Sequence, residues 1–190
     1  MNARRIAVTA QVAVTALAAL VFGSSAGAAD LRLAKLSRKV AYTAVPAASI
    51  VRVASGRTVE GKVTFAPGLG GSPTGTAAQI CGRVFVSATK FIAGSGDSFG
   101  YDQLVKQVAG TPVDANDASK GCRYALTALP HSVALSIDAH YTPTTAWNPP
   151  CEGDISQIGT NKVMTLTLPN ASVKVTLDQV IDYKTCGWLK

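Results

Sequence analysis

A serine in the segment Gly96-Asp97-Ser98-Phe99-Gly100 has neighbours that are typical of a catalytic nucleophile. The pattern Gly-x-Ser-x-Gly marks a sharp strand-to-helix turn that exposes a reactive hydroxyl. Such a turn needs a parallel sheet with crossover helices, and the roughly forty residues between Ser98 and the candidate base His140 are too few for them. Glycines and short polar residues also favour an ordinary loop. A small secreted serine hydrolase that uses Ser98 is therefore kept as an alternative function, and a loop is the structure we expect.

Ser136, Asp138 and His140 are the residue types of a catalytic triad at alternating positions. Side chains two residues apart on a strand share a face but lie about 7 Å apart, too far for a chain of direct hydrogen bonds. The pattern therefore predicts a solvated sheet face, and we expect no catalytic residues. The oxygen-rich segments 114–117 and 152–154 lack the spacing of a calcium loop and are explained by turns, so we expect no metal and no cofactor.

The proline-containing segment 141–150 is the most suggestive binding stretch in the chain. Its prolines stiffen a loop that would present Tyr141 and Trp147 as stacking surfaces for a sugar or a peptide. The alternative is that an aromatic side chain caps one end of the fold beside Cys151. Tyr141 and Trp147 are the predicted ligand contacts, and the predicted partner is a cell-surface polysaccharide or protein.

The N-terminal residues have the order of a cleaved secretory signal over residues 1–29. Arg4 and Arg5 precede an uncharged run over residues 6–22, and small residues follow at 24–29. We therefore expect a secreted protein, extracellular or periplasmic, with no transmembrane segment after cleavage.

Four cysteines, Cys81, Cys122, Cys151 and Cys186, follow this signal. An even number of cysteines in an oxidising compartment predicts two disulfides, and four cysteines allow three connectivities. We favour Cys81–Cys122 with Cys151–Cys186, because each bridge then joins a strand region to a later one. Their spacing suits neither a redox pair nor a zinc site.

The charge pattern argues against a nucleic-acid partner. The net charge is +7, but the basic residues are scattered and are not interleaved with aromatic residues. The charged fraction of 15% is low, which suits an apolar, strand-rich secreted domain. The oligomeric state cannot be deduced from these features.

Short apolar runs separated by turn residues predict an all-β fold from residue 40 onward. The clearest strand is 133–141, in which odd positions are apolar and even positions are mostly small or polar. Residues 169–172 have the composition of a hairpin turn between two strands. Residues 101–108 are the one helical candidate.

These patterns divide the chain into three parts. Residues 1–29 are the signal peptide, residues 30–56 an N-terminal arm with the first strands, and residues 57–190 a single β-sandwich domain. A further alternative function is a subunit of a surface assembly that pairs by strand addition, with residues 30–40 as a donated or accepted strand.

Several of these strands resemble the carboxypeptidase-regulatory or transthyretin-like β-sandwich. The similar segments are Gly61-Lys62-Val63-Thr64, residues 82–88, residues 121–130 and residues 133–137. The resemblance covers residues 57–142 and departs from the family in the insert 91–120 and in the added C-terminal strands. It implies an Ig-like/transthyretin-like antiparallel sandwich and a non-enzymatic module with a binding or structural role at the cell surface.

Two disulfides predict a simple result in intact-mass measurements of the exported protein. Alkylation should add no mass before reduction and four alkyl groups after reduction, because all four cysteines are oxidised. A gain of alkyl mass by the unreduced, denatured protein would reveal free thiols and contradict the pairing.

Overall fold

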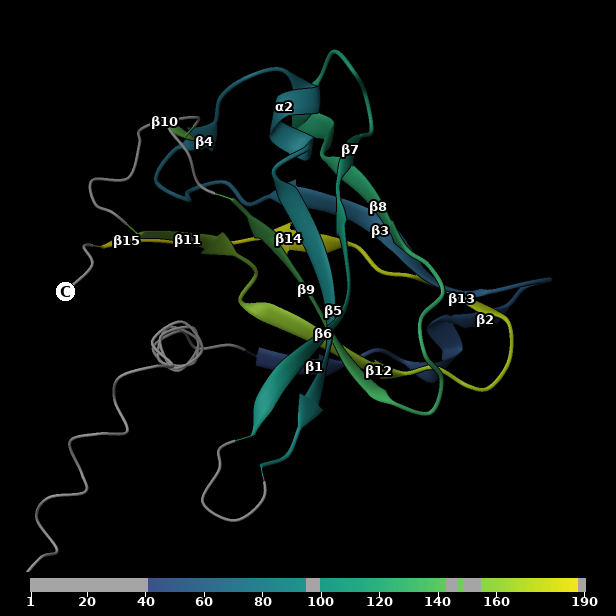
Figure 1. Ribbon diagram of the computed structural model, residues 1–190. Helices are drawn as coiled ribbons and strands as arrows, with labels where there is room; N and C mark the ends of the chain where they lie inside the picture. The colour runs from purple at the N-terminus through teal and green to yellow at the C-terminus, as the bar shows by residue number, and fades with distance from the viewer. Residues whose placement is uncertain (1–40, 95–99, 143–146, 149–154, 188–190) are drawn as a thin grey trace, which may run out of the picture. The chain divides into compact units, whose positions relative to one another are not determined.

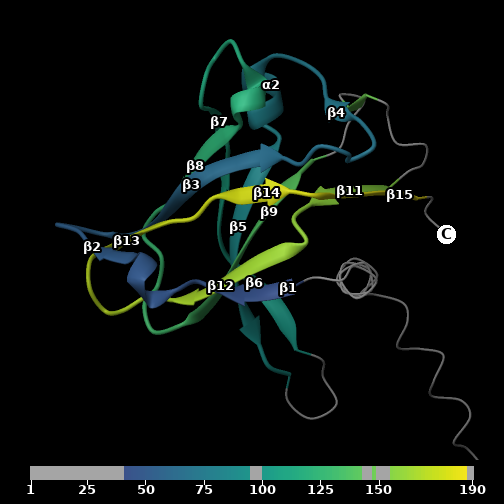
Figure 2. The same ribbon diagram turned by 180° about the vertical axis from the view of Figure 1, so that it is seen from behind.

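The computed structural model describes residues 41–94, 100–142, 147–148 and 155–187, and these residues form an all-β fold (Figures 1 and 2). The chain divides into two compact units, Met1–Lys39 and Val40–Lys190, and all described residues belong to the second. The predicted signal peptide and the arm over residues 30–39 therefore lie outside the described residues. The helical segments in the described part of the chain are too short to span a membrane.

Fifteen strands, one α-helix and two 3₁₀ turns make up the described fold. Their bounds are β1 (Ala41–Ala44), η1 (Ala47–Ser49), β2 (Ile50–Arg52), β3 (Arg57–Phe65), β4 (Ser72–Pro73), α2 (Ala77–Cys81), β5 (Val84–Ile92), β6 (Tyr101–Ala109), β7 (Thr111–Pro112), η2 (Ala118–Lys120), β8 (Cys122–Leu126), β9 (Ala134–Tyr141), β10 (Trp147–Asn148), β11 (Ile155–Gly159), β12 (Lys162–Thr167), β13 (Val173–Thr176), β14 (Gln179–Ile181) and β15 (Tyr183–Gly187).

Two large sheets share one hydrophobic core. In the seven-stranded sheet, β9 pairs with β5, and it also pairs with β12 through its first half and with β11 through its last two residues. β6 then pairs with β5, β1 with β12, and β15 with β11. In the six-stranded sheet, β3 pairs with β8, β13 and β14. Buried side chains from both sheets belong to a single cluster, which includes Val59, Val63, Val86, Leu135, Ile137, Val175 and Ile181. A separate two-stranded sheet joins β4 to β10 at one end.

The alternating pattern of residues 133–141 is confirmed as a strand with one buried face. In β9, Leu135, Ile137, Ala139 and Tyr141 are buried and the residues between them are partly exposed. β8 alternates in the same way from the opposite sheet. Burial of such one-sided strands against each other is what holds a two-sheet β fold together.

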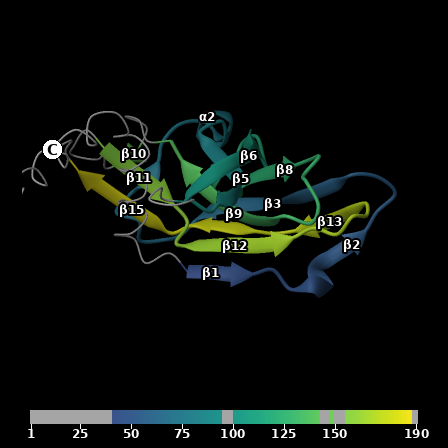
Figure 3. The same ribbon diagram turned by 60° about the horizontal axis from the view of Figure 1, so that its bottom comes forward.

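The strand directions differ from the purely antiparallel sandwich that the sequence predicted. β1 runs parallel to β12 (Figure 3). β13 and β14 both run parallel to β3. The predicted hairpin around residues 169–172 is also wrong, because β12 belongs to the seven-stranded sheet and β13 to the six-stranded sheet. The turn carries the chain from one sheet to the other instead of back along the same sheet.

Residues 101–108, the helical candidate, form strand β6 instead. β6 (Tyr101–Ala109) pairs antiparallel with β5 along its length, with a register shift between Ala88 and Thr89. A helix of this length is marginal in water by itself, whereas β5 offers the backbone a full ladder of partners.

The predicted disulfide between Cys81 and Cys122 is confirmed. It joins the end of α2 to the start of β8, with the two Cα atoms 5.4 Å apart and both residues fully buried. Cys151 lies outside the described residues, and the backbone of Cys186 on β15 pairs with Ser156 of β11. The second bridge, Cys151–Cys186, stays a prediction.

Gly61 in the middle of β3 lets the segment that connects β13 to β14 come close to the backbone of β3. A Cβ atom at Gly61 would lie 2.1 Å from the carbonyl oxygen of Leu177. The same oxygen accepts a 2.5 Å hydrogen bond from the hydroxyl of Tyr124, and the backbone N–H of Lys62 donates to Asp178 Oδ1 at 2.8 Å. Burial, with the nearby charge of Asp178, raises the pKa of Tyr124, so its hydroxyl stays protonated and donates.

Gly61→Ala should destabilise the protein by about 3 kcal/mol, because the added methyl group meets backbone that cannot move without breaking the pairing of β3. Gly82→Ala is the matched control. Gly82 follows α2 with an ordinary φ of −64°, and a Cβ there would come no closer than 3.2 Å to the Ala78 carbonyl oxygen. We expect this control to change stability by less than about 1 kcal/mol. Equal losses in chemical denaturation would show that the approach at Gly61 is not a tight constraint.

Candidate binding site

An open cleft of about 410 Å³ is lined by residues from the end of β3 and the loop after it, from β4, from α2 and from η2. Figure 1 shows β4 and α2 at one end of the fold. The side chains that define it are Phe65, Pro67, Ser72, Pro73, Ile80 and Ser119, and the remaining lining consists of glycine and alanine. None of these described lining residues is charged. The volume falls within the range of small-ligand sites in proteins.

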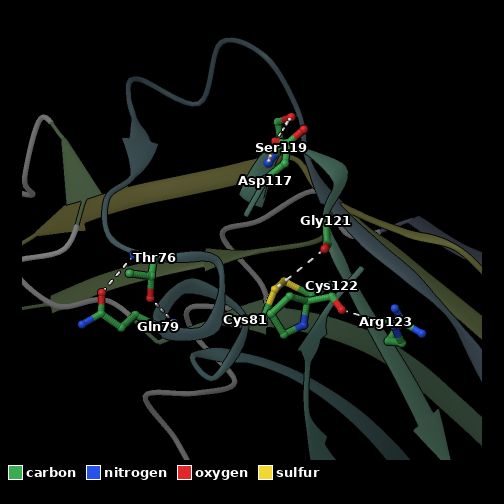
Figure 4. Close-up of a disulfide and its surroundings, with 9 residues drawn as sticks. Thr76, Gln79, Cys81, Asp117, Ser119, Gly121, Cys122 and Arg123 are labelled. Atoms are coloured by element: carbon green, nitrogen blue, oxygen red, sulfur yellow. Dashed lines mark hydrogen bonds between the residues drawn. A yellow bond between two sulfur atoms is a disulfide. The ribbon is translucent and has the colours of Figure 1, made fainter. Parts of the chain in front are cut away.

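The wall formed by α2 is fixed by a capping box and by the disulfide (Figure 4). The Gln79 side chain accepts from the Thr76 backbone N–H at 2.9 Å, and Thr76 Oγ1 accepts from the Gln79 N–H at 3.3 Å. Cys81 then ties the last residue of the helix to β8. Ile80, which lines the cleft, sits between these two restraints.

The wall formed by η2 is fixed by Asp117. Its Oδ1 accepts from both the backbone N–H and the hydroxyl of Ser119, at 2.9 and 2.5 Å (Figure 4). These bonds, made to the charged form, lower the pKa of Asp117. The cleft is therefore bounded on two sides by short segments with their own local hydrogen bonds.

Three rings, which we call the aromatic cluster, lie behind the cleft: Phe65, Tyr141 and Trp147. The ring centroids are 5.6 Å apart for Phe65 and Tyr141, 6.0 Å for Phe65 and Trp147, and 5.6 Å for Tyr141 and Trp147, all edge to face. Phe65 belongs both to this cluster and to the cleft lining. It therefore forms the boundary between them.

Lys184 on β15 connects the aromatic cluster to the loop after β3. Its Nζ lies 5.1 Å from the centroid of the Trp147 ring and donates to the carbonyl oxygen of Gly70 at 3.1 Å. Partial burial lowers the pKa of Lys184 from its ordinary value. The ammonium holds the glycine-containing loop close to the indole.

The structure places Tyr141 and Trp147 in the core and not on the surface of a loop. Their exposed fractions are 1% and 2%, and Trp147 on β10 pairs with Pro73 on β4. The expectation of exposed stacking surfaces is therefore corrected, and the physical reason is the large apolar area that two aromatic side chains remove from water. The position at one end of the fold agrees with the alternative that the sequence left open. Direct contact with a ligand stays a prediction.

Two polar atoms of the aromatic cluster are buried without a hydrogen-bond partner among the described residues. They are Tyr141 OH and Trp147 Nε1, and Gln179 Nε2 in β14 is a third such atom. Most buried polar groups in proteins are paired, and each exception needs a physical explanation. Both side chains contact the ring of Phe65, which lines the cleft.

The sequence did not identify Phe65, Lys184 or the cleft itself. Phe65 and Lys184 meet Trp147 only in the folded chain, so no local pattern connects them. The capping box at Thr76 and Gln79 was readable, because Thr-x-x-Gln is a helix-start pattern.

The remaining candidate residues are Ser98 and the three residue types of a possible triad on β9. Ser98 lies outside the described residues. Ser136, Asp138 and His140 share the outer face of β9, as predicted, and His140 stacks on Phe85 of β5 with a centroid distance of 5.6 Å.

The carboxylates of the segment 114–117 stabilise their own turn. Asp114 pairs with Lys120 at 2.7 Å and accepts from the Asn116 N–H at 2.9 Å, which lowers the pKa of Asp114. Within the described ranges, no group of three or more histidine, cysteine, aspartate or glutamate side chains could hold a metal ion.

Comparison of the chain with protein-family models, with curated proteins and with solved structures found no match. The function is therefore inferred from the geometry of the cleft and of its surroundings.

The burial of Trp147 predicts its fluorescence. Trp188→Phe leaves Trp147 as the one tryptophan of the chain, and its emission should be blue-shifted and weakly quenched by acrylamide. Unfolding in guanidinium should move the emission to the red and make quenching efficient. Strong quenching of the folded variant would contradict the buried position.

Proposed function

We propose that this protein is a secreted, non-enzymatic β-sandwich module that binds a neutral cell-surface glycan in the cleft beside the aromatic cluster. The observation that carries this proposal is the cleft of about 410 Å³, with an aromatic ring and an uncharged lining. Its walls are held by the disulfide, the capping box and Asp117. A site with such walls is largely formed before the ligand arrives, which reduces the entropic cost of binding.

The uncharged lining favours a neutral ligand. An ionised group in this cleft would lose hydration without gaining a counter-charge from the lining, and that loss is unfavourable. A neutral sugar instead presents apolar C–H groups to Phe65 and the prolines. Its hydroxyl groups match the side chain of Ser72 and the surrounding backbone.

The cellular setting of the proposal comes from the sequence. The signal-like residues 1–29 and the Cys81–Cys122 bridge both suit an oxidising compartment outside the cytoplasm. The resemblance to the carboxypeptidase-regulatory or transthyretin-like sandwich supports a module without bond-making chemistry, and the two-sheet fold suits that resemblance.

Filling the cleft should abolish binding. The measurement is titration calorimetry with neutral tetrasaccharides of glucose, N-acetylglucosamine and mannose. Ser119→Phe should lower the affinity for the glycan that the wild type binds by at least about tenfold, because the new ring occupies the cleft. Ser119→Ala removes the hydroxyl without filling the space, and Ala115→Phe adds the same ring at an exposed position outside the lining. Both controls should stay within about twofold of the wild type.

Two results would overturn the proposal. One is a wild-type protein that binds none of the neutral glycans at physiological ionic strength. The other is a Ser119→Phe variant that is folded and binds as tightly as the Ala115→Phe control.

A further inference from the structure

We infer that the glycan carries an N-acetyl group, and that Trp147 Nε1–H and the Tyr141 hydroxyl donate hydrogen bonds to its carbonyl oxygen. This inference rests on the proposed function and names the class of sugar that the same site takes.

The two donors determine what kind of atom they can receive. The indole N–H of tryptophan donates only, and the tyrosine hydroxyl donates or accepts. Both atoms are buried and have no partner among the described residues, and their rings are 5.6 Å apart. A carbonyl oxygen has two lone pairs, so a single carbonyl oxygen that reaches both donors satisfies both.

The surroundings of the donors select among acceptors. The aromatic cluster encloses them in apolar surface, so a carboxylate would lose its hydration there. The ammonium of Lys184 lies over the face of the Trp147 ring and donates to Gly70, while the N–H points outward in the ring plane. A sugar hydroxyl brings a proton that needs its own acceptor. An acetamido group supplies a carbonyl oxygen for the donors and a methyl group for the rings.

Phe65 and β4 connect the cleft to the residues that carry the donors. Phe65 lines the cleft and contacts both rings, and Ser72 and Pro73 of β4 line the cleft and pair with Asn148 and Trp147 of β10. This pairing involves only two residues of each strand. Gly71 and Gly75 flank β4 with φ of 127° and 129°, a region that only glycine adopts readily. A small movement of β4 therefore admits the acetamido group without disturbing the two large sheets.

Tyr141→Phe tests this inference because it removes one oxygen atom and keeps the ring. The probes are the β-1,4 tetramers of N-acetylglucosamine and of glucose, which share a backbone and differ in the acetamido group. The wild type should bind the N-acetylglucosamine tetramer about tenfold more tightly than the glucose tetramer. Tyr141→Phe should lose most of this preference and leave the affinity for the glucose tetramer unchanged.

A stability measurement separates this role from a structural one. The Tm of unliganded Tyr141→Phe should equal or exceed that of the wild type, because the variant buries one unpartnered hydroxyl fewer. Tyr124→Phe is the matched control. Its hydroxyl is bonded to the Leu177 carbonyl oxygen, so its loss should lower the Tm and leave the preference for the acetylated tetramer intact.

The two proposals fail in different ways. If the wild type binds neutral glycans and Ser119→Phe blocks them, but the acetamido group brings no advantage or Tyr141→Phe keeps that advantage, the role of the two donors is wrong and the cleft remains the site. If the wild type binds no neutral glycan, both proposals fall. Tight binding of the deacetylated, cationic glucosamine tetramer would likewise exclude the carbonyl as the recognised group.

Discussion

The close approach of the Leu177 carbonyl oxygen to Gly61 is the constraint on which the rest of the fold depends. The bend at this point lets one segment of chain run beside β3 as β13 and then again as β14, both parallel to it. The Tyr124 hydroxyl bonds the same oxygen and so joins the bend to β8. Because β14 continues along β3, Ile181 comes to lie opposite Phe65, and Phe65 is where the cleft and the aromatic cluster meet. A constraint in the centre of one sheet thus positions the site at its end.

The sequence predicts those parts of the fold that local alternation decides. β9 was readable because its two faces differ in polarity, and one such face can only be buried against a second layer. The sequence did not predict β6, because residues 101–108 are too short a segment for the spacing of their apolar residues to be decisive. Pairing with β5 determines that the segment is a strand. The turn at residues 169–172 was recognised as a turn, but turn chemistry does not say which sheet receives the next strand.

The site was predictable only in part, for a related reason. Composition singled out Tyr141 and Trp147. In the structure Tyr141 belongs to the buried face of β9, and Trp147 is buried on β10, which pairs with β4. Phe65 and Lys184 come from β3 and β15, and nothing near them in the sequence indicates a shared neighbour. The Cys81–Cys122 bridge was one of the pairings that three possible connectivities allow, and it forms, although Cys81 ends helix α2 and not a strand.

The unpartnered donors argue that packing alone did not select these side chains. A phenylalanine at position 141 would keep the ring contacts with Phe65 and Trp147 and would avoid burying a hydroxyl without a partner, which costs about 1–3 kcal/mol. The hydroxyl of Tyr124, which is equally aromatic and 5% exposed, does have a partner, because it donates to a carbonyl oxygen. Departures from local consistency concentrate at functional sites. The two tyrosines therefore differ: the hydroxyl of Tyr124 stabilises the fold, and the hydroxyl of Tyr141 is the one that we propose to bind a ligand.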